Sequence, residues 1–189
     1  MPVPKKDRRV RIYADCRDLN KACPKDDFPL PHIDVLIDNV ATCGMYSFMD
    51  GFTRYNQILM AIIKKAKMSF ITEWGTYYYR VMPFSMKNIV VTYQRMATTM
   101  FHDMIHKEVE VYIDYMMVKL KTREGHPVVL EKFLKRVKKY SLKLNPKKCI
   151  FGVTSNKILG YIVCQNGIEM DPNKAKAIRE MPVPKTERG

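Results

Sequence analysis

The chain has 189 residues, 47% of them hydrophobic, which is enough for a folded domain with an apolar core. Its formal net charge of +14 at pH 7 favours a polyanionic partner such as nucleic acid; a basic surface kept for solubility is the alternative. No apolar run approaches the length of a membrane span, and the first residues lack the apolar run of a signal peptide. We therefore expect an intracellular protein, not a secreted one, with no membrane partner. Its five cysteines form no C-x-x-C pair, which argues against a disulfide framework or a zinc ribbon.

Short apolar runs separated by turn signals predict the elements of the first part of the chain. Apolar residues at intervals of three and four indicate a helix, and runs rich in β-branched or aromatic residues indicate strands. Closely spaced prolines indicate an extended loop. In chain order we expect a basic loop at 5–9, a strand at 10–14, an extended loop at 21–31, a short helix at 33–40, a strand at 46–50, a turn through 55, a strand to 60, and a hairpin of 68–72 with 76–81.

Longer periodic segments follow in the second part. The stripe formed by Val129, Phe133, Val137 and Tyr140 predicts a helix whose other sides are rich in lysine. Interleaved helices and antiparallel strands indicate an α+β class, in which a layer of helices backs one sheet. In chain order the expected elements are a helix at 91–105, a β-hairpin of 109–113 with 116–118, the helix carrying the 129–140 stripe, strands near 149–153 and 158–163, a turn at 166–167 and a helix near 174–180.

Two aspartates stand at the ends of predicted strands. Asp50 ends the strand at 46–50, and Asp114 lies at the tip of the predicted hairpin. Mg²⁺ prefers hard oxygen ligands and commonly uses one or two carboxylates together with substrate phosphates. Two such carboxylates brought together by a sheet therefore suit in-line phosphoryl transfer. Aspartates that only cap turns are the alternative.

The segment 50–58 (DGFTRYNQI), followed by Tyr112-Ile113-Asp114, resembles the palm of the reverse transcriptases of gypsy-type LTR retrotransposons. Further motifs extend this resemblance, in the same order, from residue 9 to about residue 180. They are 11–20 (RIYADCRDLN), similar to the fingers strand; 28–31 (FPLP), similar to the link from fingers to palm; 70–72, 74–76, 82–88 (MPFSMKN) and 93–94 (YQ), which match the segment shaping the nucleotide and template side; 145–152 (NPKKCIFG), similar to the closing segment of the palm; and 159–161 (LGY), similar to the hairpin that grips the primer.

The resemblance implies a right-hand polymerase fold, with an antiparallel palm sheet backed by helices, partial fingers and the start of a thumb. It makes residues 1–189 one reverse transcriptase domain, with about 1–45 and 58–85 fingers-like, 46–57 and 86–165 in the palm, and 166–189 at the start of the thumb or connection. The implied activity is RNA-directed DNA polymerisation on an RNA or DNA primer–template duplex. Its implied substrates are deoxynucleoside triphosphates, and its implied cofactors are two Mg²⁺ ions, with Mn²⁺ as an alternative.

No segment resembles a protease, a ribonuclease H or an integrase. We therefore expect a fragment of a Pol polyprotein, or a stand-alone relic of one, with those Pol domains as candidate partners. Its expected location is a cytoplasmic particle or the nucleus.

The resemblance also assigns roles to individual residues. From the residues alone Tyr55 suits a hydrophobic core, and the lysines suit a solvated face. By resemblance, the expected catalytic and metal-binding residues are Asp50 and Asp114; the nucleotide-binding residues are Arg11 on the triphosphate, Tyr55 as an aromatic gate beneath the sugar, Phe84 and Gln94; the primer grip is Leu159, Gly160 and Tyr161; and the nucleic-acid contacts are Lys147 and Lys148.

Several residues depart from the family's pattern. Tyr115 occupies the position of a further metal-binding aspartate, and both Arg54 and Ser85 stand where the family has glycine. Glu110 cannot replace the missing carboxylate, because four residues along a strand span roughly 13 Å. We therefore expect an impaired copy. The alternatives are an inactive nucleic-acid-binding remnant of the same fold and a basic interaction protein without polymerase activity.

Overall fold

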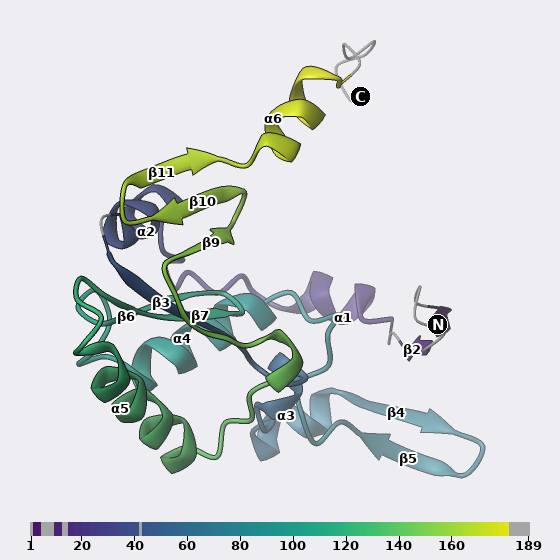
Figure 1. Ribbon diagram of the computed structural model, residues 1–189. Coiled ribbons are helices and arrows are strands. Elements are labelled where there is room, and N and C mark those ends of the chain that lie inside the picture. The colour runs from purple at the N-terminus through teal and green to yellow at the C-terminus, as the bar shows by residue number, and fades with distance from the viewer. Residues whose placement is uncertain (1, 5–9, 13–14, 42, 182–189) are drawn as a thin grey trace.

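The computed structural model describes residues 2–4, 10–12, 15–41 and 43–181, and its elements are shown in Figure 1. The helices are α1 (Arg17–Ala22), α2 (Ile33–Val40), α3 (Ile62–Lys67), α4 (Ile89–Met100), α5 (His126–Lys139) and α6 (Pro172–Arg179), with the 3₁₀ helices η1 (Arg54–Gln57) and η2 (Pro146–Lys148). The strands are β1 (Pro2–Pro4), β2 (Val10–Ile12), β3 (Met45–Asp50), β4 (Ser69–Thr72), β5 (Gly75–Tyr78), β6 (Val109–Tyr112), β7 (Tyr115–Leu120), β8 (Ile150–Val153), β9 (Ser155–Ile158), β10 (Tyr161–Cys164) and β11 (Gly167–Met170).

A four-stranded antiparallel sheet, in the order β6-β7-β3-β8, forms the centre of the molecule. Successive side chains of a strand point to opposite faces, so each strand contributes to two cores. On one face Met49, Met116 and Val118 pack against α4 and α5, where the rings of Phe101 and Phe133 stack with centroids 4.7 Å apart. This layer of helices behind one sheet confirms the predicted α+β class.

The opposite face of the central sheet is also covered. Tyr46, Phe48 and Met117 pack there against α2 and against a small antiparallel sheet of order β11-β10-β9. Figure 1 shows α4 and α5 on one side of the central sheet, and α2 with the small sheet on the other. All of β3 is therefore buried, which explains why large apolar residues lie on both of its faces.

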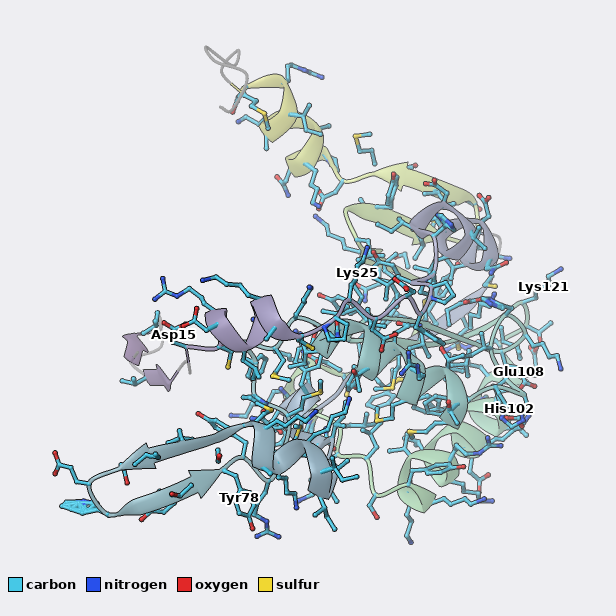
Figure 2. The ribbon with its side chains drawn as sticks, turned by 180° about the vertical axis from the view of Figure 1, so that it is seen from behind. Asp15, Lys25, Tyr78, His102, Glu108 and Lys121 are labelled. Carbon is cyan, nitrogen blue, oxygen red and sulfur yellow. The ribbon has the colours of Figure 1, made fainter. Side chains whose placement is uncertain are left out.

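Two parts of the chain project from this body. The β4–β5 hairpin has exposed side chains on both strands, and its tip carries Trp74, which is 71% exposed. Figure 2 shows this hairpin extending outward, with Tyr78 at the end nearer the body. At its base, Met60, Met68 and Met82 form a third apolar cluster with Tyr55 and Tyr93. Helix α6 projects in another direction and buries none of its residues (Figure 1).

The structure confirms the predicted helices near 33–40 and 174–180, the 68–81 hairpin and the 109–118 hairpin, and it corrects other predictions. Residues 17–20, the end of the motif similar to the fingers strand, and residues 21–22, predicted to begin an extended loop, form α1. The predicted strand at 158–163 is divided by a turn at Leu159 and Gly160, and both have positive φ, at 51° and 94°. Helix α3 and strand β11 were not predicted. Tyr140, placed in the apolar stripe of α5, lies just beyond that helix and is exposed.

Candidate active site

The central sheet brings Asp50 and Asp114 together. Asp50 is the last residue of β3 and lies opposite Tyr115 in the β3–β7 register. Asp114 belongs to the tight turn between β6 and β7, one residue before Tyr115. Both carboxylates are largely withdrawn from solvent, with side chains 7% and 12% exposed. The predicted pair of strand-end carboxylates therefore exists as a single cluster.

Gln94 of α4 holds the hairpin that carries Asp114. Its Oε1 accepts a hydrogen bond from the Ile113 backbone N–H at 2.7 Å, and its Nε2 donates to the Val111 carbonyl at 3.1 Å. Ile113 has a φ of 54°, which a β-branched residue rarely adopts, so the turn needs external support. Gln94 is 1% exposed and its amide faces the hairpin, so it supports the turn that carries Asp114.

Arg54 binds both aspartates at once. Its Nε donates to Asp50 Oδ1 at 3.1 Å and its Nη2 donates to Asp50 Oδ2 at 3.3 Å, while its Nη1 pairs with Asp114 Oδ2. Lys148 adds a second cation, with its Nζ 3.0 Å from Asp50 Oδ2. Burial raises the pKa of the Asp50 carboxyl, but the hydrogen bonds from Arg54 and Lys148 outweigh it and hold that pKa below its ordinary value. Asp50 is therefore an ionised carboxylate in an ion-paired cluster.

Tyr55 lies beside the same cluster. Its hydroxyl donates to Asp114 Oδ1 at 2.9 Å, and its ring meets Phe84 and Tyr93 edge-on, with centroids 5.4 Å and 5.5 Å away. Burial, followed by the bond to Asp114, raises the pKa of Tyr55, so the hydroxyl remains a protonated donor. Phe84 is exposed above this ring. The two aromatic residues predicted at the nucleotide site are thus in contact with each other.

The loop that carries Phe84 is tied to α1 by Asn20, a residue without a predicted role. Asn20 Nδ2 donates to the Ser85 carbonyl at 2.7 Å, and the Lys87 backbone N–H donates to Asn20 Oδ1 at 2.8 Å. A side-chain amide that accepts and donates to one loop fixes its position. Asn20 therefore positions the Phe84 loop over Tyr55.

Close backbone packing follows Asp50. A Cβ added to Gly51 would lie 2.7 Å from the Tyr93 hydroxyl oxygen, so only glycine fits here without a shift. The Phe52 N–H donates to the Lys143 carbonyl, and the Asn145 N–H donates to the Asp50 carbonyl. These contacts bring the 143–148 segment, including Lys148, against the end of β3.

The remaining predicted site residues lie around this centre. Arg11 is in β2, where only the backbone is described. Leu159 and Gly160 form the turn between β9 and β10, and Tyr161 begins β10. Lys147 is exposed on η2. Glu110 is buried, and its oxygens lie 2.9 Å from Lys119 Nζ and 3.1 Å from His106 Nδ1, so it offers no replacement carboxylate.

The residues present do not fit a pair of divalent metal ions. Tyr115 contributes a phenol where a carboxylate, the ligand that Mg²⁺ commonly uses, would be needed. Arg54 and Lys148 already supply positive charge to the two aspartates. Within the described part of the chain, no group of three or more histidine, cysteine, aspartate or glutamate residues could hold a metal ion.

An antiparallel sheet backed by two helices, with two aspartates converging at the ends of its strands, defines a polymerase palm. Residues 3–163 match the family model for "Reverse transcriptase (RNA-dependent DNA polymerase)", and the chain therefore belongs to this family. Enzymes of the family generally use divalent metal ions. In the part of the chain that the structure describes, no helix is long and apolar enough to cross a membrane.

Relatives of the chain include Pol polyproteins of Drosophila melanogaster transposons. It is 32% identical to the Retrovirus-related Pol polyprotein from transposon opus, over 97% of this chain and 18% of that protein. It is 29% identical to the polyprotein from transposon gypsy, over 92% of this chain and 17% of that protein. The chain thus spans less than a fifth of these relatives and is similar to the reverse transcriptase region of LTR retrotransposon Pol polyproteins.

Solved structures of foamy viral protease-reverse transcriptase share the fold. One, in complex with double-stranded DNA, aligns with a TM-score of 0.83 and 20% identity over 99% of this chain and 39% of that chain. Another, in complex with an RNA/DNA hybrid, has a TM-score of 0.79 and 19% identity over 97% of this chain and 24% of that chain. At this level of identity the likeness establishes the polymerase fold alone.

Proposed function

We propose that this chain is the polymerase domain of an LTR retrotransposon Pol polyprotein, which binds a primer–template duplex and whose RNA-directed DNA polymerisation is impaired. The observation that carries the proposal is the convergence of Asp50 and Asp114 at the end of β3 and the β6–β7 turn, beside Tyr55. Both strand-end carboxylates are present where phosphoryl transfer would take place. Their present partners are two cations and a tyrosine.

In this proposal Tyr55 and Phe84 receive the sugar and base of an incoming deoxynucleoside triphosphate. Phe84 is exposed and meets the buried ring of Tyr55 edge-on, so an apolar ring face is available beside the tyrosine that bonds the Asp114 carboxylate. Arg11 would bind the triphosphate, and Leu159, Gly160 and Tyr161 would hold the primer end. The two Mg²⁺ ions, or Mn²⁺ ions, implied by the sequence resemblance are not accommodated by the side chains as they lie, which supports impaired rather than efficient polymerisation.

Duplex binding is supported by the distribution of positive charge. The basic residues of α5 are partly neutralised, because Lys132 pairs with Glu108 at 3.0 Å, Lys135 with Glu131 at 2.8 Å and Arg136 with Asp103 at 2.8 Å. Lys147, in contrast, has no acidic partner within the described residues. We therefore assign phosphate contact to the η2 segment next to the site, in preference to the outer face of α5.

A second candidate function is duplex binding without any polymerisation, and the contacts of Arg54 with both aspartates favour it. Fluorescence anisotropy of a labelled primer–template at several salt concentrations measures binding, and primer extension with deoxynucleotides measures chemistry. We expect binding that weakens as salt rises. The Tyr115→Asp/Arg54→Gly variant should extend the primer at least about a hundredfold faster than the natural chain, the scale on which lost electrostatic stabilisation acts.

The outcomes separate the two candidates. A double variant that binds duplex and extends the primer supports the impaired polymerase. A double variant that binds duplex as tightly as the natural chain but remains silent favours the binding remnant. Absence of salt-dependent duplex binding in the natural chain would refute both.

A further inference from the structure

We propose that Arg54 is a built-in cation that holds Asp50 and Asp114 together in place of a divalent metal ion, so that this chain keeps its carboxylate pair closed to metal. The inference deepens the proposed function, and it rests on that function only in taking the aspartate pair as the place where a polymerase would bind metal. It concerns what occupies the pair, which can be measured without any polymerase assay.

All four carboxylate oxygens of the pair already have a partner. Asp50 Oδ1 accepts from Arg54 Nε, and Asp50 Oδ2 accepts from Arg54 Nη2 and lies 3.0 Å from Lys148 Nζ. Asp114 Oδ1 accepts from the Tyr55 hydroxyl, and Asp114 Oδ2 pairs with Arg54 Nη1. A metal ion would have to displace several of these contacts to reach the oxygens.

The guanidinium suits this bridging role. Its planar fork presents donors in several directions at once and remains charged at any ordinary pH. Here each of its three nitrogens faces a carboxylate, two toward Asp50 and one toward Asp114. Because the arginine is covalently attached, it reaches the site without the loss of translational freedom that a free ion would undergo.

The charges in the cluster are balanced. Two carboxylates contribute two negative charges, and Arg54 and Lys148 contribute two positive charges. A divalent ion entering this cluster would meet two like charges at short range, in a site where the aspartates are largely buried. Like charges at contact distance repel strongly where solvent is excluded. Mn²⁺ or Mg²⁺ binding should therefore be weak while Arg54 is present.

The backbone at Arg54 supports the same interpretation. Thr53 and Arg54 have consecutive positive φ values, 51° and 42°, in the left-handed region that favours glycine. An arginine stays in such a conformation only where its surroundings compensate for the strain, and here the two carboxylates do so. Arg54→Gly therefore suits the local backbone and removes the guanidinium in one change.

Metal binding by the purified full chain tests the proposal. The electron paramagnetic resonance signal of free Mn²⁺ gives the number of bound ions by difference from the total, and thermal denaturation with and without Mn²⁺ reports binding to the folded state. We expect the natural chain to show no saturable site and no Mn²⁺-dependent rise in Tm. Arg54→Gly should gain one saturable site, with an apparent Kd at least about tenfold tighter than any binding by the natural chain, because an opposing charge has been removed. Arg54→Gln, which keeps the side-chain length without the charge, should gain affinity in the same direction.

Two controls make the result specific to the pair. Arg136→Ala removes an arginine from another bidentate ion pair, with Asp103 at 2.8 Å and 2.9 Å, and should gain no site. Adding Asp50→Asn to Arg54→Gly should abolish the gained site. Circular dichroism verifies that each variant is folded.

Two results would overturn the proposal: tight Mn²⁺ binding by the natural chain, or folded Arg54→Gly and Arg54→Gln variants that gain no site. Duplex binding, measured on the same samples by anisotropy, tests the proposed function separately. Its loss would refute the duplex-binding proposal and leave the Mn²⁺ result valid.

Discussion

Replacing Gln94 tests how strongly α4 holds the hairpin that carries Asp114. Gln94→Leu keeps the approximate size of the side chain but removes its bonds to the Ile113 N–H and the Val111 carbonyl. Strand β6 is at the edge of the central sheet, so no neighbouring strand can satisfy these two groups. A buried polar group left without a partner costs about 1–3 kcal/mol. Gln94→Leu leaves two such groups, and the one on the half-buried Ile113 should cost less than a fully buried group. We therefore expect the free energy of unfolding to fall by about 2–4 kcal/mol in total.

Urea denaturation of the natural chain and of Gln94→Leu measures this loss. Far-UV circular dichroism is the appropriate signal, because the single tryptophan, Trp74, is exposed at the tip of the β4–β5 hairpin and does not report on the core. The slope of the unfolding free energy against urea concentration should stay unchanged, and the urea concentration at the midpoint of unfolding should fall.

Gln94→Glu supplies a matched control. A protonated glutamic acid can accept from Ile113 and donate to Val111, whereas the ionised form loses the donor and buries a charge. Burial raises the pKa of such a group, so Gln94→Glu should be nearly as stable as the natural chain below about pH 4, the ordinary range of a glutamic acid pKa. Its stability should then fall as the pH rises from there toward the raised pKa of the folded state. Gln94→Leu should show no such pH dependence. If Gln94→Leu loses less than about 0.5 kcal/mol, the range of ordinary surface substitutions, the argument that Gln94 supports the hairpin is refuted.

Two further predictions concern the segments around Asp50. Gly51→Ala should destabilise the fold by about 1–3 kcal/mol, because the added methyl group overpacks against the Tyr93 hydroxyl. Adding Tyr93→Phe removes that hydroxyl and should recover most of the lost stability, as measured by thermal denaturation. If the double variant is no more stable than Gly51→Ala, the methyl group does not clash with the Tyr93 hydroxyl. Lys147→Ala should reduce the slope of log affinity against log salt for duplex binding by about 0.9, the value for one phosphate contact. Lys148→Ala should reduce this slope less, because the Asp50 carboxylate already offsets the Lys148 charge. Equal effects of the two variants would contradict the assignment of the phosphate contact to Lys147.

Local sequence patterns were sufficient for the elements that are periodic and adjacent in the chain. The 109–118 hairpin and the helix at 33–40 were predicted from alternation and helical spacing, because each signal lies within a short segment. The pairing of Asp50 with the hairpin also followed from the motif order in the sequence. No helix was predicted at 17–22, because residues 11–20 were likened to a fingers strand and residues 21–31 were read as a loop, whereas Arg17–Ala22 is helical. The turn at Leu159 and Gly160 was hidden inside an apolar run that reads as one strand.

The composition of the site was decided by tertiary structure. Arg54 was recognised from the sequence only as a bulky replacement for glycine, because nothing in the local sequence shows that the backbone turns with two positive φ values and directs the guanidinium to both aspartates. Lys148 reaches Asp50 because the 143–145 backbone pairs with the end of β3, almost a hundred residues earlier in the chain. Gln94 faces the back of the hairpin only once α4 is packed on the sheet. Hydrophobic periodicity thus determined which strands and helices form. The partners of the two carboxylates were determined by hydrogen bonds and ion pairs between distant segments, because such contacts depend on orientation within a few ångströms.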